Sequence, residues 1–143
     1  MIMFKKNRGS VIIEMTLIVP LFFLLLFAIV DGARMIFFYS SVAHGAREAV
    51  RYAVVRGTEA GQDNRRIGDS PATENQIEAY VQQRIPALSD LRVTTVWPLD
   101  ENNNPIKDSG QVVQVTVEHD FIPLAPLMPA VTLTSTSSTV IYF

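Results

Sequence analysis

Hydrophobic residues are unevenly distributed along the 143-residue chain. Residues 11–30 form a nearly continuous apolar run, and its three exceptions are Glu14, Thr16 and Pro20. Because a helix rises about 1.5 Å per residue, twenty residues span about 30 Å, the thickness of a bilayer core. The run therefore predicts a transmembrane helix.

The helical pattern continues beyond this run. Small residues recur at every fourth position, and they are Ser41, Gly45, Ala49 and Ala53. The neighbouring row is apolar and consists of Val42, Ala46, Val50 and Val54. Gly57 suits the position after a helix end, so we expect one helix from Ser10 to Arg56. Pro20 should kink it, because proline has no N–H to donate.

Small residues let a helix approach its neighbour closely. The stripe at 41–53 therefore predicts a packing surface. Two partners are open for it: the protein's own sheet, which we favour, and neighbouring subunits. The two can also apply at different heights along the helix.

The second half of the chain changes to a mixed pattern. A polar segment, 58–73, is followed by a short predicted helix at 74–85, capped by Thr73 or Ser70. Strict alternation or β-branched residues then predict strands at 91–97, 113–121 and 131–143. The link 98–110 is expected to be an exposed hairpin loop. The proline-rich link 122–130 is expected to cross the sheet edge, with a subunit contact as the alternative.

Charge gives the predicted span a direction. Lys5, Lys6 and Arg8 precede it and Asp31 follows it directly, while residues 10–143 carry a net charge of −5. The positive-inside rule then places the N-terminus in the cytoplasm and the rest across the membrane. The net charge of −2 argues against a nucleic-acid partner that needs a basic surface.

Three interpretations of the apolar run compete. A cleaved signal peptide would need a small-residue site, for which only Val30 and Gly32 before Ala33 qualify. A plain single-span anchor is the second. Neither explains Glu14, because a charge at the centre of a membrane helix costs about 2.5–3.5 kcal/mol, less near its end.

The third interpretation explains the carboxylate. The sequence Lys5-Lys6-Asn7-Arg8-Gly9, followed by Ser10-Val-Ile-Ile-Glu14, resembles the leader of a type IV prepilin. In that family a membrane peptidase cuts after the glycine, and a glutamate stands fifth in the mature chain. The resemblance implies cleavage between Gly9 and Ser10. It also implies that Glu14 neutralises the N-terminal amine of a neighbouring subunit and sets the assembly register.

Two further segments resemble TadE-like minor pilins of tight-adherence (Tad or Flp) pili. They are Glu14-Met-Thr-Leu-Ile-Val-Pro20 and Ala46-Arg-Glu-Ala-Val-Arg-Tyr-Ala53, and they differ from the family at Met15, where an aromatic residue is usual. The resemblance is specific over 8–57. It implies an α+β, type IV pilin-like lollipop, in which the long helix packs on a small antiparallel sheet.

The implied organisation has three parts: a leader at 1–9, the long helix at 10–57 and a periplasmic or extracellular domain at 58–143. The implied protein is a minor pilin or pseudopilin held in the inner membrane until assembly. Its partners would be a major Flp-type pilin, a second minor pilin, a prepilin peptidase, the membrane assembly platform with its ATPase, and the lipid bilayer. A secretion-system pseudopilin, a tethered binding domain and a secreted soluble domain remain alternatives.

The sequence offers little catalytic chemistry. It has no cysteine and two histidines, so thiolate and histidine-rich metal sites are not expected. His44 is predicted to pair with Glu48 on the helix surface, and His119 to be a partly buried structural residue. We expect no enzyme, no cofactor, no metal and no small-molecule substrate.

Two groups of acidic residues have structural interpretations. Asp31 and Arg34 are predicted to pair at i, i+3, in a solvated or interfacial position. Asp100, Glu101 and Asp108 do not have the spacing of a calcium-binding EF-hand.

Overall fold

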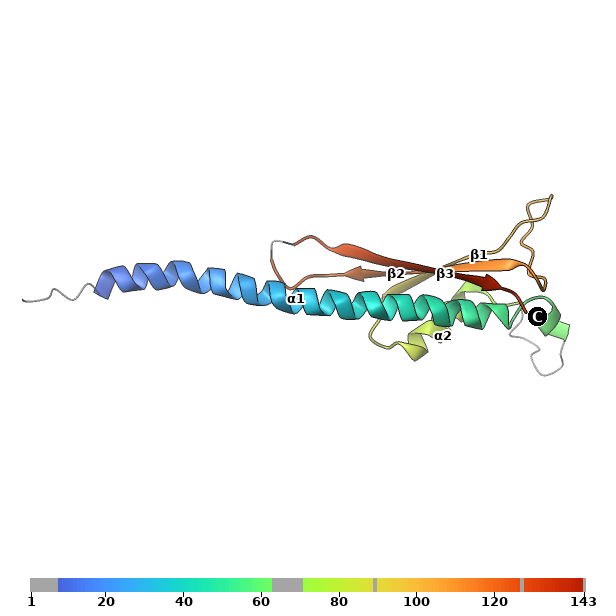
Figure 1. The fold of residues 1–143 in the computed structure, drawn as a ribbon, viewed down its shortest axis with the longest axis horizontal. Helices are drawn as coiled ribbons and strands as arrows, with labels where there is room; N and C mark the ends of the chain where they lie inside the picture. The colour runs from blue at the N-terminus through green and yellow to red at the C-terminus, as the bar shows by residue number, and fades with distance from the viewer. Residues whose placement is uncertain (1–7, 63–70, 89, 127, 143) are drawn as a thin grey trace, which may run out of the picture.

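The computed structural model describes residues 8–62, 71–88, 90–126 and 128–142. Its elements are α1 (Arg8–Val54), a 3-10 helix (Glu59–Gln62), α2 (Glu74–Arg84), β1 (Leu91–Val96), β2 (Val112–Phe121) and β3 (Val131–Val140). Figure 1 shows α1 running the length of the molecule, with every strand beside its C-terminal half. This arrangement confirms the predicted α+β lollipop.

Helix α1 is a single helix of 47 residues that begins two residues before the predicted start and ends two residues before the predicted end. Its last turn tightens, because the Arg56 N–H donates to the Ala53 carbonyl at 3.0 Å. Pro20 lies inside the helix and leaves the Thr16 carbonyl without its usual donor. The helix nevertheless continues through this point (Figure 1).

The short helix α2 begins as the sequence predicts. Thr73 is its N-cap, and its side chain accepts from the Gln76 N–H while the Gln76 side chain accepts from the Thr73 N–H. This reciprocal capping box satisfies two donors that the first helical turn leaves unpaired. Ser70, the other predicted cap, lies outside the described residues.

The three strands form an antiparallel sheet in the order β1-β2-β3. Leu91 pairs with His119 across β1 and β2, and Phe121 pairs with Val131 across β2 and β3. The link 122–130 therefore joins neighbouring strands as a hairpin, which corrects the predicted crossing of the sheet edge. Figure 1 places this hairpin at the end of the sheet nearest the free half of α1.

The core lies between the sheet and the C-terminal half of α1. β2 buries alternate residues, as its pattern predicts: Val113, Val115, Val117, His119 and Phe121. From α1, the core takes Val42, Ala46, Ala49, Val50, Ala53 and Val54. Helix α2 closes the side of the core with Ile77 and Val81. The sheet therefore hides one face of α1, and only in its second half.

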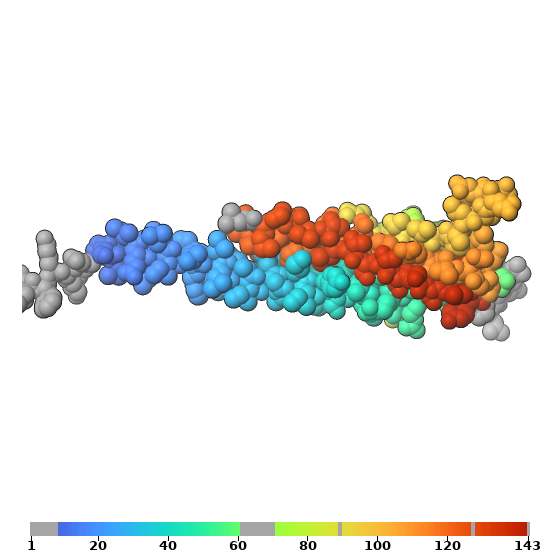
Figure 2. Space-filling view, turned by 45° about the horizontal axis from the view of Figure 1, so that its top comes forward, coloured from blue at the N-terminus to red at the C-terminus, as the bar shows by residue number. Residues whose placement is uncertain are grey.

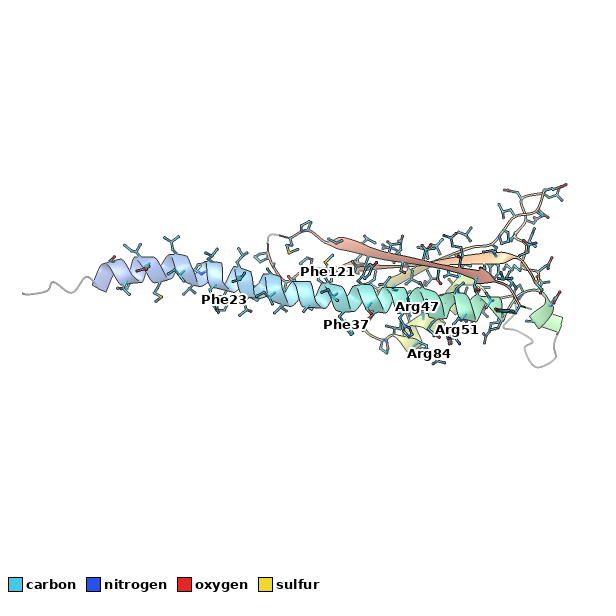
Figure 3. The ribbon with its side chains drawn as sticks, viewed as in Figure 1. Phe23, Phe37, Arg47, Arg51, Arg84 and Phe121 are labelled. Atoms are coloured by element: carbon cyan, nitrogen blue, oxygen red, sulfur yellow. The ribbon has the colours of Figure 1, made fainter. Side chains whose placement is uncertain are left out.

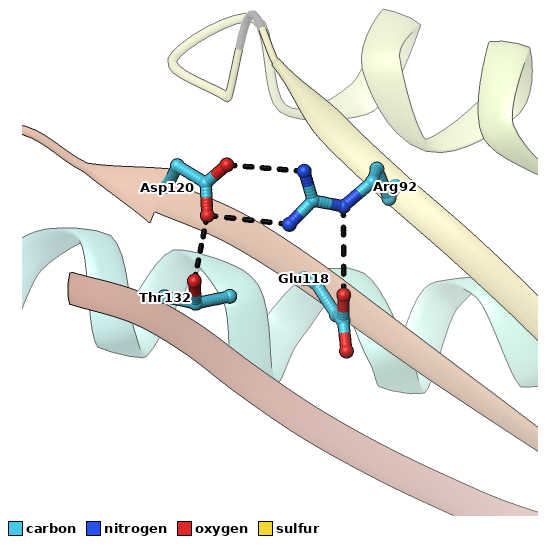
Figure 4. Close-up of polar contacts among 4 residues, drawn as sticks. All are labelled: Arg92, Glu118, Asp120 and Thr132. Carbon is cyan, nitrogen blue, oxygen red and sulfur yellow. Dashed lines mark hydrogen bonds and ion pairs between the residues drawn. The ribbon is translucent and has the colours of Figure 1, made fainter. Parts of the chain in front are cut away.

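The other face of the sheet carries a polar network that connects all three strands (Figure 4). The Arg92 guanidinium on β1 donates to both carboxylate oxygens of Asp120 on β2, at 3.0 and 3.2 Å. Arg92 Nε lies 3.5 Å from Glu118, and the Thr132 hydroxyl on β3 donates to Asp120 at 2.8 Å. Such two-pronged pairing is geometrically specific, so the network supports the strand register.

Candidate functional site

The N-terminal half of α1 is an apolar surface that the protein leaves open. Every side chain from 11 to 30 is exposed. In Figure 2 this segment extends from the body with no other described element against it. Burying one large apolar side chain is worth about 1.5–3 kcal/mol, so this surface needs an apolar environment. The helix is long and apolar enough to cross a membrane.

The predicted cleavage site lies at the start of this helix. Gly9 and Ser10 are both helical and exposed, and a side chain added at Gly9 would meet no atom within 4 Å. The glycine is therefore not required by packing. Lys5 and Lys6 of the predicted leader lie outside the described residues.

Glu14 lies one turn after this site, on the exposed helix. The described chain gives its carboxylate no ion-pair partner. The nearby Thr16 hydroxyl is satisfied locally, because it donates to the Ile12 carbonyl at 2.7 Å. Glu14 is thus an exposed acidic side chain in an apolar segment, and no other described residue neutralises it.

The stripe of small residues lies farther along α1, where the sheet and α2 cover it. Gly45, Ala49 and Ala53 are buried, whereas Ser41 is half-buried and donates to the Phe37 carbonyl. A Cβ added at Gly45 would lie 3.3 Å from Val81 Cγ1 and 3.4 Å from Ile85 Cδ1. The stripe therefore faces the protein's own core, and it is absent from the open half of the helix.

Asp31 marks the boundary between the two halves, and its predicted pair with Arg34 is confirmed. The residue is 1% exposed, so the solvated position is wrong. Its carboxylate accepts the backbone N–H groups of Leu124 at 2.9 Å and Ala125 at 2.8 Å, and it pairs with Arg34 at 2.9 Å. Asp31 thereby ties the β2–β3 hairpin to α1.

An aromatic cluster adjoins this tie. The Arg34 guanidinium lies 5.2 Å from the ring centre of Phe121, and Phe38 lies 5.0 Å from the ring of His119. His119 is 6% exposed, and its Nδ1 has no hydrogen-bond partner in the described structure. Figure 3 shows Phe121 at the side of the sheet that faces α1. The cluster fixes the end of β2 against the helix directly beyond the apolar run.

The hydrogen bonds make Asp31 sensitive to acid. Its pKa lies below the usual value, first because the Leu124 N–H donates to the carboxylate, and also because Ala125 and Arg34 do; burial opposes this shift. A lowered pKa means that the stabilisation is present above the unfolded-state pKa of about 3.9. It is lost as the pH falls through the folded-state pKa.

We therefore expect Asp31→Asn to lower the thermal midpoint at pH 7 by roughly 5–15 °C, because charge-assisted bonds are lost. The difference from the wild type should shrink near pH 3. Circular dichroism of the full chain in detergent measures both values. Asp108→Asn, at an exposed turn, is the matched control and should change the midpoint little. An Asp31→Asn effect of equal size at both pH values would refute the role of the charge.

The remaining predicted polar residues are dispersed. His44 is exposed, and Glu48 pairs instead with Arg51, 3.7 Å away, so the predicted His44–Glu48 pair is not formed. The Asp100 carboxylate accepts the backbone N–H groups of Asn102 and Asn104 within its own turn. Within the described ranges, no group of three or more histidine or acidic residues is placed to hold a metal ion.

The comparison with known families finds a match over most of α1. Residues 9–51 match the model of the family described as TadE-like protein. Through this segment, the chain is similar to the TadE-like family. The match covers the candidate cleavage site, Glu14, Pro20 and the tie at Asp31, and it confirms the resemblance seen in the sequence. The chain matches no curated protein and no solved structure. Its similarity over 9–51 suggests involvement in Tad pilus assembly.

Proposed function

We propose that this TadE-like protein is a minor pilin or pseudopilin of a Tad-type pilus, released from its leader by cleavage between Gly9 and Ser10. Residues 11–30 hold it in the inner membrane before assembly, with the folded domain on the periplasmic side. The observation that carries the proposal is the open apolar half of α1, which joins directly to a small folded domain. The protein would then act by assembly and would have no catalytic role.

Glu14 would direct that assembly. Cleavage after Gly9 creates an α-amine, whose reference pKa of about 7.7–8.0 leaves it largely protonated at neutral pH. A neighbouring subunit's amine would be the missing partner of the Glu14 carboxylate. Because an unpaired charge in an apolar environment is costly, the pair would favour one axial offset between adjacent helices. The major pilin, a second minor pilin, the peptidase and the assembly platform are the proposed partners.

Loss of the gene separates this proposal from its nearest alternative. If the protein is a Tad minor pilin, deletion of its gene should abolish or strongly reduce surface fibres while protein export continues, and complementation should restore the fibres. If it is a secretion pseudopilin, deletion should stop export and leave the surface fibres unchanged. Unchanged fibres would contradict the proposal. If protein export also continued, a tethered binding domain would be the better account.

The proposed orientation has its own test, because the chain has no cysteine. Asn103 lies exposed in the loop between β1 and β2. We expect Asn103→Cys to react with a membrane-impermeant maleimide in cells whose outer membrane is permeabilised. The matched variant Lys6→Cys, examined in a strain without the peptidase, should react only after the inner membrane is opened. The reverse pattern would overturn the orientation.

A further inference from the structure

The base of the folded domain, where α1 leaves the apolar run and meets the β2–β3 hairpin, has almost no exposed charge. Between Glu14 and Arg47, Asp31 and Arg34 are the only Asp, Glu, Lys or Arg residues, and these two pair with each other. Asp31 is buried, and the side chain of Arg34 is 35% exposed. Residues 121–143 contain no acidic or basic residue and no histidine. The charged pair that follows the apolar run is therefore largely neutralised within the fold.

Large apolar side chains are exposed around this base instead. Three come from α1 and three from the β2–β3 hairpin, with exposures from 47% to 73%: Ile36, Phe37, Tyr39, Ile122, Leu124 and Met128. We refer to these six residues as the collar. Figure 3 shows Phe37 on the side of α1 away from the sheet, whereas the hairpin lies on the sheet side. The collar therefore occupies both sides of the helix.

The height of the collar follows from its connections. Asp31 comes directly after the apolar run, and it holds the backbone of Leu124 and Ala125 within 2.9 Å. The helical part, 36–39, begins five residues beyond Asp31, which is about 7–12 Å along the axis. The interfacial layer of a bilayer is roughly 5–8 Å thick on each side of the hydrocarbon. The hairpin part of the collar, held at the height of Asp31, thus begins where that layer begins. The helical part lies at the outer edge of the layer and just beyond it.

We propose that the collar lies at the headgroup layer of the lipid bilayer, so that the domain rests on the membrane at its base. This inference depends on the proposed function, in which 11–30 span the membrane. Lipid is the favoured occupant because the collar continues the apolar surface of the span and adds an aromatic residue, Tyr39, that suits the interface. By hiding its own charge and tying the hairpin down, Asp31 allows Leu124 to reach this layer.

Single-cysteine variants of the full chain test the proposal. Leu124→Cys and Phe37→Cys replace exposed side chains, and they leave the Leu124 N–H that Asp31 accepts in place. Each variant carries an environment-sensitive fluorophore and is reconstituted in phosphatidylethanolamine–phosphatidylglycerol vesicles with lipids that bear a quencher near the headgroup or deep in the acyl chain. Phe23→Cys reports on the span, and Asn103→Cys is the water-exposed control.

We expect the probes at positions 124 and 37 to show blue-shifted emission. The quencher near the headgroup should remove most of that emission. The Phe23 probe should respond to the deep quencher, and the Asn103 probe to neither. Collar probes that stay unquenched while the Phe23 probe is quenched would overturn the collar and leave the span intact. An unquenched Phe23 probe would instead refute the span. If the blue shift of the collar probes disappears when the protein is diluted in lipid, a second copy of the chain covers the collar, and the proposal is overturned.

Discussion

Replacing Glu14 by alanine is expected to reduce assembled pili by at least about tenfold while membrane insertion and leader cleavage continue. The described fold gives the Glu14 carboxylate no partner, so its loss should leave the folded domain intact. In the assembled filament, removal of one member of a buried ion pair costs on the order of 3 kcal/mol. A tenfold effect needs only about 1.4 kcal/mol.

The control for this experiment is Thr16→Ala. Thr16 is the neighbouring polar residue of the same exposed segment, and its hydroxyl bonds within its own helix. The variant should assemble at the wild-type level. The measurement is quantification of sheared surface pili together with the mass of the membrane-held subunit. Wild-type pilus levels with Glu14→Ala would show that the carboxylate does not direct assembly.

The second large effect is expected at Gly45, where leucine should destabilise the folded domain. The Cβ alone would lie 3.3 Å from Val81 Cγ1, and the rest of a leucine side chain would have to displace α2 or β2. Overpacking of this kind costs about 1–3 kcal/mol or more. At about 4–8 °C per kcal/mol for a domain of this size, the thermal midpoint should fall by roughly 4–24 °C.

Gly32→Leu provides the matched comparison in the same helix. A Cβ at Gly32 meets no atom within 4 Å, and leucine favours the helix over glycine by up to about 1 kcal/mol. Its midpoint should be equal to or above that of the wild type. Thermal unfolding of both variants in detergent measures the difference. Equal midpoints for the two variants would contradict close packing at Gly45.

Local periodicity was sufficient to predict most of the secondary structure. Strict alternation identified the buried face of β2. The sequence named Thr73 as one of two possible caps, and the structure confirms Thr73. The end of β3 was less predictable. The β-branched residues continue to Val140 and an apolar tail follows, although the strand ends at Val140 and the Ile141 N–H bonds the Gln111 carbonyl instead.

Features that depend on distant contacts could not be predicted. Asp31 seemed to belong to a local i, i+3 pair, and nothing near it in sequence shows that a hairpin 93 residues away donates two N–H groups to it. The path of the 122–130 link depends on which strands are neighbours in the sheet. That pairing is a long-range feature, and the sequence pattern does not show it. In the same way, the alternation predicts that Arg92 faces outward. Its bond to Asp120 depends on the strand register, which places Arg92 opposite Glu118, two residues from Asp120.

The open helix half and the family match support a subunit that is processed and then assembled. The most direct test is the intact mass and N-terminal sequence of the native protein from cell membranes. The account predicts a chain that begins at Ser10. A chain that retains Lys5 and Lys6 would contradict it and indicate a permanent membrane anchor.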